Sequence, residues 1–190
     1  MAAPAPFRLA YVRGVTPAKW VRTWEERMRR VPLQLVRTDE PDQVSVLIDG
    51  LADMALVRLP VAGDGLHSIP LYEERAVVVV PRDHAVAAAD EVTLAEVAEL
   101  GRPVHPFDAA VEDTLALVAA GVGSMVLPQS VARLHSRRDL VARPVTDAAP
   151  TRIALAWMSD PVPPRSDSEQ HRIDTFIGIV RGRTANSSRR

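Results

Sequence analysis

The spacing of hydrophobic residues in the first third of the chain predicts strands that alternate with helices. Residues 7–12 alternate in polarity and predict a strand that ends before Gly14. A helix is expected next, because Thr16 and Pro17 suit an N-cap and a first helical position. Trp20, Trp24 and Met28 recur every four positions and define its buried face. A strand at 33–36, a helix at 42–49 and a strand at 54–59 are predicted to follow.

The rest of the chain repeats this alternation with shorter elements. Strands are predicted at 66–71, 76–80, 124–127, 140–145 and 151–157, and helices at 93–100, 114–120, 130–134 and 168–181. Thr93 and Glu96 have the spacing of a capping box. Strands separated by helices indicate a parallel, doubly wound sheet, which binds ligands beyond the carboxyl ends of its strands. The loops of interest are therefore 13–16, 37–40 and 58–61.

Composition agrees with a globular protein and excludes several functions. The chain has 190 residues, of which 47% are hydrophobic and 25% are charged, enough for one domain or two small lobes. The net charge of -1 predicts no direct binding to nucleic acid. Without cysteine, and with five scattered histidines, we expect no disulfide, metal or other cofactor. The absence of a long apolar run predicts a cytoplasmic protein without membrane contact.

Six short segments in a fixed order carry a more specific signal. They are 53–57 (DMALV), 69–73 (IPLYE), 77–84 (VVVVPRDH), 92–98 (VTLAEVA), 118–128 (VAAGVGSMVLP) and 153–157 (IALAW). In combination they resemble the effector-binding domain of LysR-type transcriptional regulators, over the chain from Phe7 to Arg181. The resemblance implies an α/β fold of the type II periplasmic-binding-protein kind, with two doubly wound lobes, two crossing strands and an effector in the cleft between the lobes.

The resemblance also sets the expected domain limits and two departures from the family. Lobe I would contain residues 7–75 plus 150–183, lobe II would contain 76–149, and 184–190 would be a flexible tail. The family's winged helix-turn-helix is expected to be absent, because the first strand starts at Phe7. Lobe II is expected to be shortened, because the family inserts more chain between Pro103 and Thr114.

Four candidate effector-binding residues belong to lobe I. The Thr16 hydroxyl, with the free N–H groups of the helix that follows, could hold a carboxylate or phosphate; alternatively it is a plain N-cap. Arg58 matches an effector-binding arginine in some family members, and Leu59 ends the same strand; the alternative for Arg58 is a solvent-facing loop residue. Thr38 matches a polar cleft position in the family, or it caps the second helix with Asp39.

Two further candidates, Phe107 and Gly121, belong to lobe II. Phe107 suits a mostly apolar pocket. Gly121 lies in a loop that the family places near the cleft wall, although a purely structural turn with Gly123 is the simpler interpretation. His84 follows the hinge segment and is interpreted as capping a turn.

These observations favour a ligand sensor over two other classes of protein. The effector would be a small anion, and the domain would form a homodimer or pair with full-length relatives. The alternatives are a cytoplasmic solute-binding protein of the same fold and a decayed regulator without a ligand. We expect no enzyme: Ser124, His105 and Asp108 occur singly, without a nucleophile elbow, a phosphate loop or a metal motif.

Overall fold

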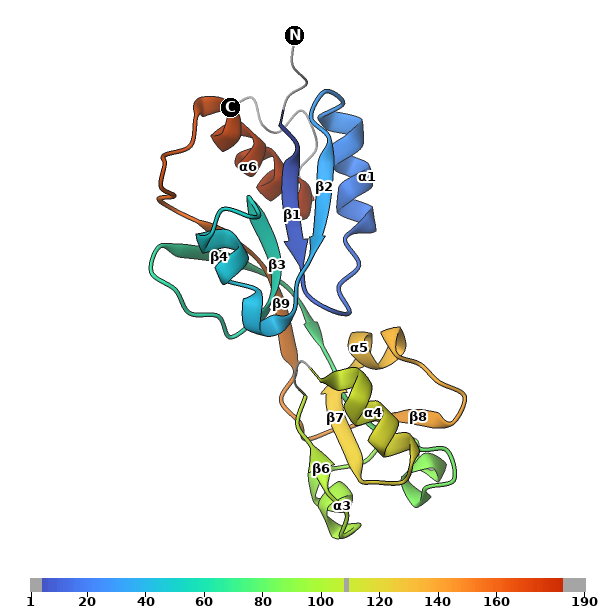
Figure 1. Ribbon diagram of the computed structural model, residues 1–190. Helices are drawn as coiled ribbons and strands as arrows, with labels where there is room; N and C mark the ends of the chain where they lie inside the picture. Colours follow the sequence, from blue (N-terminus) through green and yellow to red (C-terminus); the bar gives the residue numbers. More distant parts are fainter. Residues whose placement is uncertain (1–4, 108–109, 183–190) are drawn as a thin grey trace. The chain divides into compact units, whose positions relative to one another are not determined.

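The computed structural model describes residues 5–107 and 110–182, and these residues form two compact α/β units (Figure 1). The first unit contains 5–71 and 153–182, and the second contains 72–152. The chain passes between them within two strands, β4 (Leu66–Glu74) and β9 (Thr151–Met158). The tail expected at 184–190 and the candidate Asp108 lie outside the described residues.

The sheet of the first unit has the strand order β2-β1-β3-β9-β4. β1 pairs in parallel with both β2 and β3, which confirms the parallel arrangement that the alternating pattern predicted. The other elements of this unit are β1 (Phe7–Tyr11), α1 (Ala18–Arg27), β2 (Leu33–Arg37), the 3-10 helix η1 (Glu40–Asp42), α2 (Ser45–Ile48), β3 (Met54–Leu59) and α6 (Asp167–Val180).

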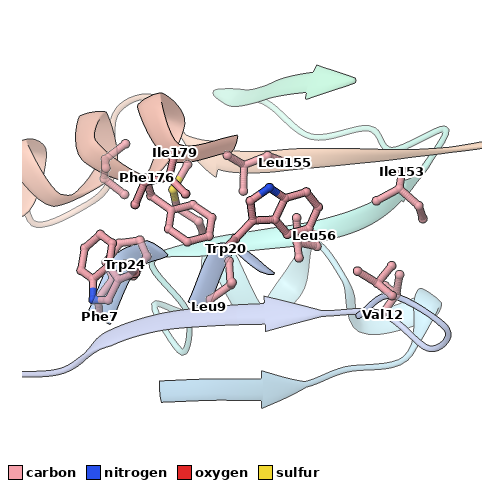
Figure 2. Packing of buried hydrophobic residues seen from close by; sticks show 13 residues of the cluster. Phe7, Leu9, Val12, Trp20, Trp24, Leu56, Ile153, Leu155, Phe176 and Ile179 are labelled. Atoms are coloured by element: carbon pink, nitrogen blue, oxygen red, sulfur yellow. The ribbon is translucent and has the colours of Figure 1, made fainter. Parts of the chain in front are cut away.

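Alternate residues of the central strands enter two different cores. Leu9, Leu56 and Leu155 face α1 and α6, whereas their neighbours, mostly alanines, face α2 on the other side of the sheet. Figure 2 shows the larger core, in which Phe7 stacks on Trp24 with ring centroids 4.4 Å apart. Small residues on one face let the short α2 approach, and large residues on the other fill the space beneath two helices.

The second unit is built around the buried strand β5. β5 pairs antiparallel with β7 and β8, and β6 pairs in parallel with β7, in the order β6-β7-β5-β8. Its valines alternate between two cores, so both faces are covered as the apolar run predicted. The elements are β5 (Ala76–Pro81), the 3-10 helix η2 (Ala85–Ala88), α3 (Leu94–Glu99), β6 (Val104–His105), α4 (Val111–Ala119), β7 (Ser124–Pro128), α5 (Gln129–Leu134) and β8 (Leu140–Pro144).

Several local predictions are confirmed and others are wrong. The Thr93–Glu96 capping box is present, and His84 accepts a hydrogen bond from the Val86 amide as a cap of η2. The helix expected at 42–49 is shorter than predicted: α2 covers only its second half, η1 precedes it, and the Ser45 hydroxyl donates to the Asp42 carbonyl between the two. No helix within the described ranges is long and apolar enough to cross a membrane.

Candidate functional site

The carboxyl ends of β1, β2 and β3 bring three loops of the first unit together. Arg13 follows β1, and its guanidinium forms a two-pronged ion pair with Asp39, which follows β2. The distances are 2.6 Å from Arg13 Nε to Asp39 Oδ1 and 3.3 Å from Nη2 to Oδ2. Because β1 and β2 are parallel and in register, the two loops emerge at the same edge of the sheet.

Arg58, from the end of β3, completes this arrangement. Its side chain is 6% exposed and forms an ion pair with Glu40, which is 20% exposed. A second guanidinium nitrogen donates to the Arg13 carbonyl at 3.2 Å. The buried Gln43 side chain pairs with the Arg58 backbone: its Nε2 donates to the Arg58 carbonyl (3.0 Å) and its Oε1 accepts from the Arg58 amide (2.8 Å).

We call Arg13, Thr38, Asp39, Glu40 and Arg58 the carboxyl-end site. It contains two arginines and two acidic residues, and each arginine pairs with a different acid. A guanidinium offers five donors in one plane, so the arginines can hold a carboxylate in two-pronged fashion. In this structure the protein's own acidic residues occupy part of that capacity.

Thr38 and Thr16 differ in their surroundings. Thr38 is 7% exposed, its amide donates to the Tyr11 carbonyl, and its hydroxyl lies 3.4 Å from the Asp39 carbonyl. The capping alternative for Thr38 and Asp39 is wrong, because η1 has no side-chain cap and Asp39 pairs with Arg13.

Thr16 is exposed and does not cap α1, which corrects the N-cap prediction. The helix starts at Ala18, and the carbonyl that opens its ladder belongs to Pro17, which accepts from the Val21 amide at 3.1 Å. No side-chain cap hydrogen bond is present at this helix start. Leu59 closes β3 and is packed in part against the smaller core of the first unit.

The two candidates from the second unit have structural surroundings of their own. Phe107 is partly buried against the core between β5, β7 and α4. Gly121 has a φ of 81° after α4, and its carbonyl accepts from Arg102. Gly123 has the stricter requirement, because an added Cβ would lie 2.3 Å from the Pro103 carbonyl oxygen. This close approach holds β6 beside β7 and supports a structural role for this loop.

Sequence reasoning singled out the loops at the carboxyl ends of β1, β2 and β3 but missed four residues in or beside them: Arg13, Asp39, Glu40 and Gln43. Each is an ordinary charged or polar loop residue, and the pairs they form join positions 15 to 26 apart in sequence. The sequence signal that could have identified two of them is the pair of acidic residues, Asp39 and Glu40, shortly after β2. Among the described side chains, no three His, Cys, Asp or Glu residues come together as a metal site would need.

The Arg13–Asp39 pair makes the stability of the site dependent on pH. The Arg13 hydrogen bond is the main cause that lowers the pKa of Asp39 below its ordinary value, against a smaller opposing effect of burial. A carboxyl with a lowered pKa in the folded state stabilises the fold at neutral pH, and this contribution is lost as the pH falls through that pKa.

Asp39→Asn should therefore unfold more easily than the parent at pH 7, and the difference should shrink below about pH 4. Urea unfolding of both proteins at several pH values measures this. Asp64→Asn, at an exposed loop position, is the matched control and should follow the parent throughout. A difference that stays the same at every pH would contradict the assignment.

An α/β chain of two units linked by two strands has the architecture of type II periplasmic-binding-protein-like domains. Residues 15–104 match the family model of the LysR substrate binding domain. This part of the chain is therefore similar to the substrate-binding domain of the LysR type, and the predicted fold class is confirmed. No match to the chain was found among curated proteins.

Solved structures with the same fold include regulatory domains of two regulators. The effector-binding domain of BenM with its effector benzoate has a TM-score of 0.72 and 18% identity, covering 95% of this chain and 92% of that one. An OxyR mutant from Corynebacterium glutamicum has a TM-score of 0.71 and 20% identity, with 94% of this chain and 64% of that chain covered. The regulatory domain of a Pseudomonas aeruginosa OxyR mutant has a TM-score of 0.69 and 20% identity, and is covered over its full length.

Proposed function

We propose that the chain is the ligand-sensing part of a cytoplasmic LysR-type regulator, and that it binds a small anion at the carboxyl-end site without catalysing a reaction. The observation that carries this proposal is the convergence of Arg13 and Arg58 on one edge of the sheet. Ligands of parallel α/β sheets bind at this edge. The buried Thr38 lies in the same loops and adds a hydroxyl.

The internal ion pairs suggest how an anion would enter. Glu40 holds Arg58, and Asp39 holds Arg13, so an incoming carboxylate would exchange with one of these side chains. Glu40 is the better candidate for exchange. If its side chain moves away, the buried Arg58 guanidinium loses its acid, and a ligand carboxylate can take the place of the Glu40 carboxylate. The benzoate in the BenM domain is a small carboxylate of this kind.

A neutral polar effector is the second candidate. One OxyR mutant from Corynebacterium glutamicum, at 22% identity and a TM-score of 0.69, was solved with hydrogen peroxide bound. If Glu40 and Asp39 keep both arginines neutralised, a neutral ligand would meet no uncompensated charge in this site.

We also propose that the domain forms a homodimer or pairs with a full-length relative. The conformational change caused by ligand binding would be transmitted through this assembly.

Thermal unfolding with a panel of small carboxylates and their neutral amides tests the proposal. A ligand at one hundred times its Kd should raise the Tm by roughly 5–10 °C through linkage. Arg58→Ala should abolish the shift, whereas Glu40→Gln should increase the affinity, because it removes the competing charge and keeps an acceptor.

The control is Arg22→Ala, which removes one positive charge from an exposed position of α1. If Arg58→Ala and Arg22→Ala respond to a carboxylate alike, the anion does not bind at Arg58. If only the amides stabilise the protein, the neutral effector is the correct candidate. If no compound stabilises it, the chain is a decayed regulator and the proposal fails.

A further inference from the structure

The first unit contains a cavity of about 500 Å³ at the opposite end of its sheet from the carboxyl-end site. It is lined by the start of β1, the turn before β3, residues 161–165 and the first turns of α6. In Figure 1 the start of β1 and α6 lie at the same end of this unit, and Arg172 of α6 donates to the Ala5 carbonyl at 3.0 Å. A volume of this size suits a small organic ligand.

One pair of charges in the cavity wall is fully used by the protein itself. Asp53 accepts from the Arg8 amide at 2.7 Å and from the Arg8 guanidinium at 2.6 Å. The Asp53 amide donates in return to the Arg8 carbonyl at 2.9 Å. Arg8 also donates to the Gly50 carbonyl. These bonds fasten the start of β1 to the turn before β3, so the pair is a structural part of the wall.

Arg165 differs from the other charged residues of this wall. It is half-buried, and it forms no hydrogen bond or ion pair with any residue in the described part of the chain. Glu169, the acid of α6 in the lining, is already held by the Ser166 amide and hydroxyl at 2.8 Å in a capping box. A half-buried guanidinium without an acceptor has lost part of its hydration without a compensating bond.

The electrostatic setting of Arg165 agrees with this geometry. Burial is the main cause that lowers the pKa of its guanidinium, against opposing effects of Asp53, Glu169, Asp160 and Asp174. The side chain nevertheless stays charged, because arginine does not lose its proton in proteins. Its five N–H donors are therefore available to a hydrogen-bond acceptor.

Besides its charged residues, which include Arg172, the wall has an apolar part. Pro161, Pro163 and Pro164 have no N–H group, and their fixed φ angles keep this part of the wall preformed. Phe7 and Leu47 add apolar surface from the sheet and from α2. This part of the wall would bind the hydrocarbon part of a ligand.

We propose that this cavity is a second small-molecule site, which binds a monocarboxylate with an aliphatic body, the carboxylate on Arg165 and the hydrocarbon part against the proline loop. The site lies within one unit and shares no residue with the carboxyl-end site. Its existence does not depend on the function proposed above. A single carboxylate matches Arg165, the guanidinium of this wall that has no hydrogen-bond or ion-pair partner among the described residues.

Hexanoate and its amide, hexanamide, are the probes, and the amide shifts in two-dimensional NMR spectra of the whole chain are the readout. Hexanoate should give saturable shifts around Arg8, Asp53 and Ile173, and hexanamide should bind about ten-fold more weakly, because it lacks the charge-assisted bond to Arg165. Arg165→Ala should also weaken the binding of hexanoate by about ten-fold and leave the binding of hexanamide unchanged.

Arg22→Ala, with the same change in net charge, and Arg58→Ala, in the other site, are the controls and should leave these shifts in place. Equal binding of hexanoate and hexanamide, or an Arg165→Ala variant that binds like the parent, would overturn the proposal. So would the absence of saturable shifts at about 10 mM, where even a millimolar site would be mostly filled. Shifts confined to residues near Arg13 and Arg58 would support only the carboxyl-end site.

Discussion

Trp24→Ala is expected to lower the free energy of unfolding by about 3–5 kcal/mol, because it removes the largest fully buried side chain of the protein. Trp24 stacks on Phe7, lies 5.9 Å from Phe176 between ring centroids, and donates from Nε1 to the Val31 carbonyl at 2.9 Å. The cavity left behind would separate α1 from α6. Urea unfolding followed by circular dichroism measures the change.

Trp24→Phe separates the ring from its hydrogen bond. It keeps most of the stacking but leaves the Val31 carbonyl without this donor, so a smaller loss of about 1–3 kcal/mol is expected. Arg22→Ala on the exposed face of α1 should stay within about 0.5 kcal/mol of the parent. If Trp24→Ala were no more destabilised than Arg22→Ala, the assignment of this core would be wrong.

Glu40→Ala should be the most destabilising single change in the carboxyl-end site, by about 2–5 kcal/mol. Arg58 is 6% exposed and would lose its ion pair with Glu40 while its guanidinium stays largely buried. The change would also destabilise the loop after β1, because Arg58 donates a hydrogen bond to the Arg13 carbonyl in that loop.

A double-mutant cycle with Glu40→Ala and Arg58→Met isolates the pair from other effects of each change. The two residues should couple by about 1–3 kcal/mol, and the double variant should be less destabilised than the sum of the single variants. Urea unfolding gives all four values. Additive losses would show that the pair contributes nothing to stability, and exchange of Glu40 for a ligand would then cost little.

Much of the fold was predictable because short-range patterns set it. The valine run at 77–80 predicts a strand covered on both faces, and its alternate residues enter two cores. Trp20 and Trp24 recur on one helical face, and both are buried. Thr93 and Glu96 lie close enough in sequence to form their capping box whatever the surrounding fold. In these cases the interacting groups are separated by few residues.

The local errors also have physical causes. The apolar positions at 44–48 fit a longer helix, but Gln43 is used to hold the Arg58 backbone and the segment divides into η1 and α2. The two-residue strand β6 was not predicted, because its existence depends on β7 and on the space that Gly123 leaves for the Pro103 carbonyl. The effector-binding roles of Thr16, Thr38, Arg58, Leu59, Phe107 and Gly121 stay predictions.

The amino-acid sequence by itself determined the alternation of strands and helices, the fold class and the three loops at the carboxyl ends of β1, β2 and β3. Only the tertiary structure decided which charges in those loops meet, since Arg13–Asp39 and Arg58–Glu40 depend on strand order and register. The Arg165 cavity likewise follows from four distant segments packed together. Patterns over a few residues determine secondary structure, whereas a binding site is made by residues that the sheet brings together.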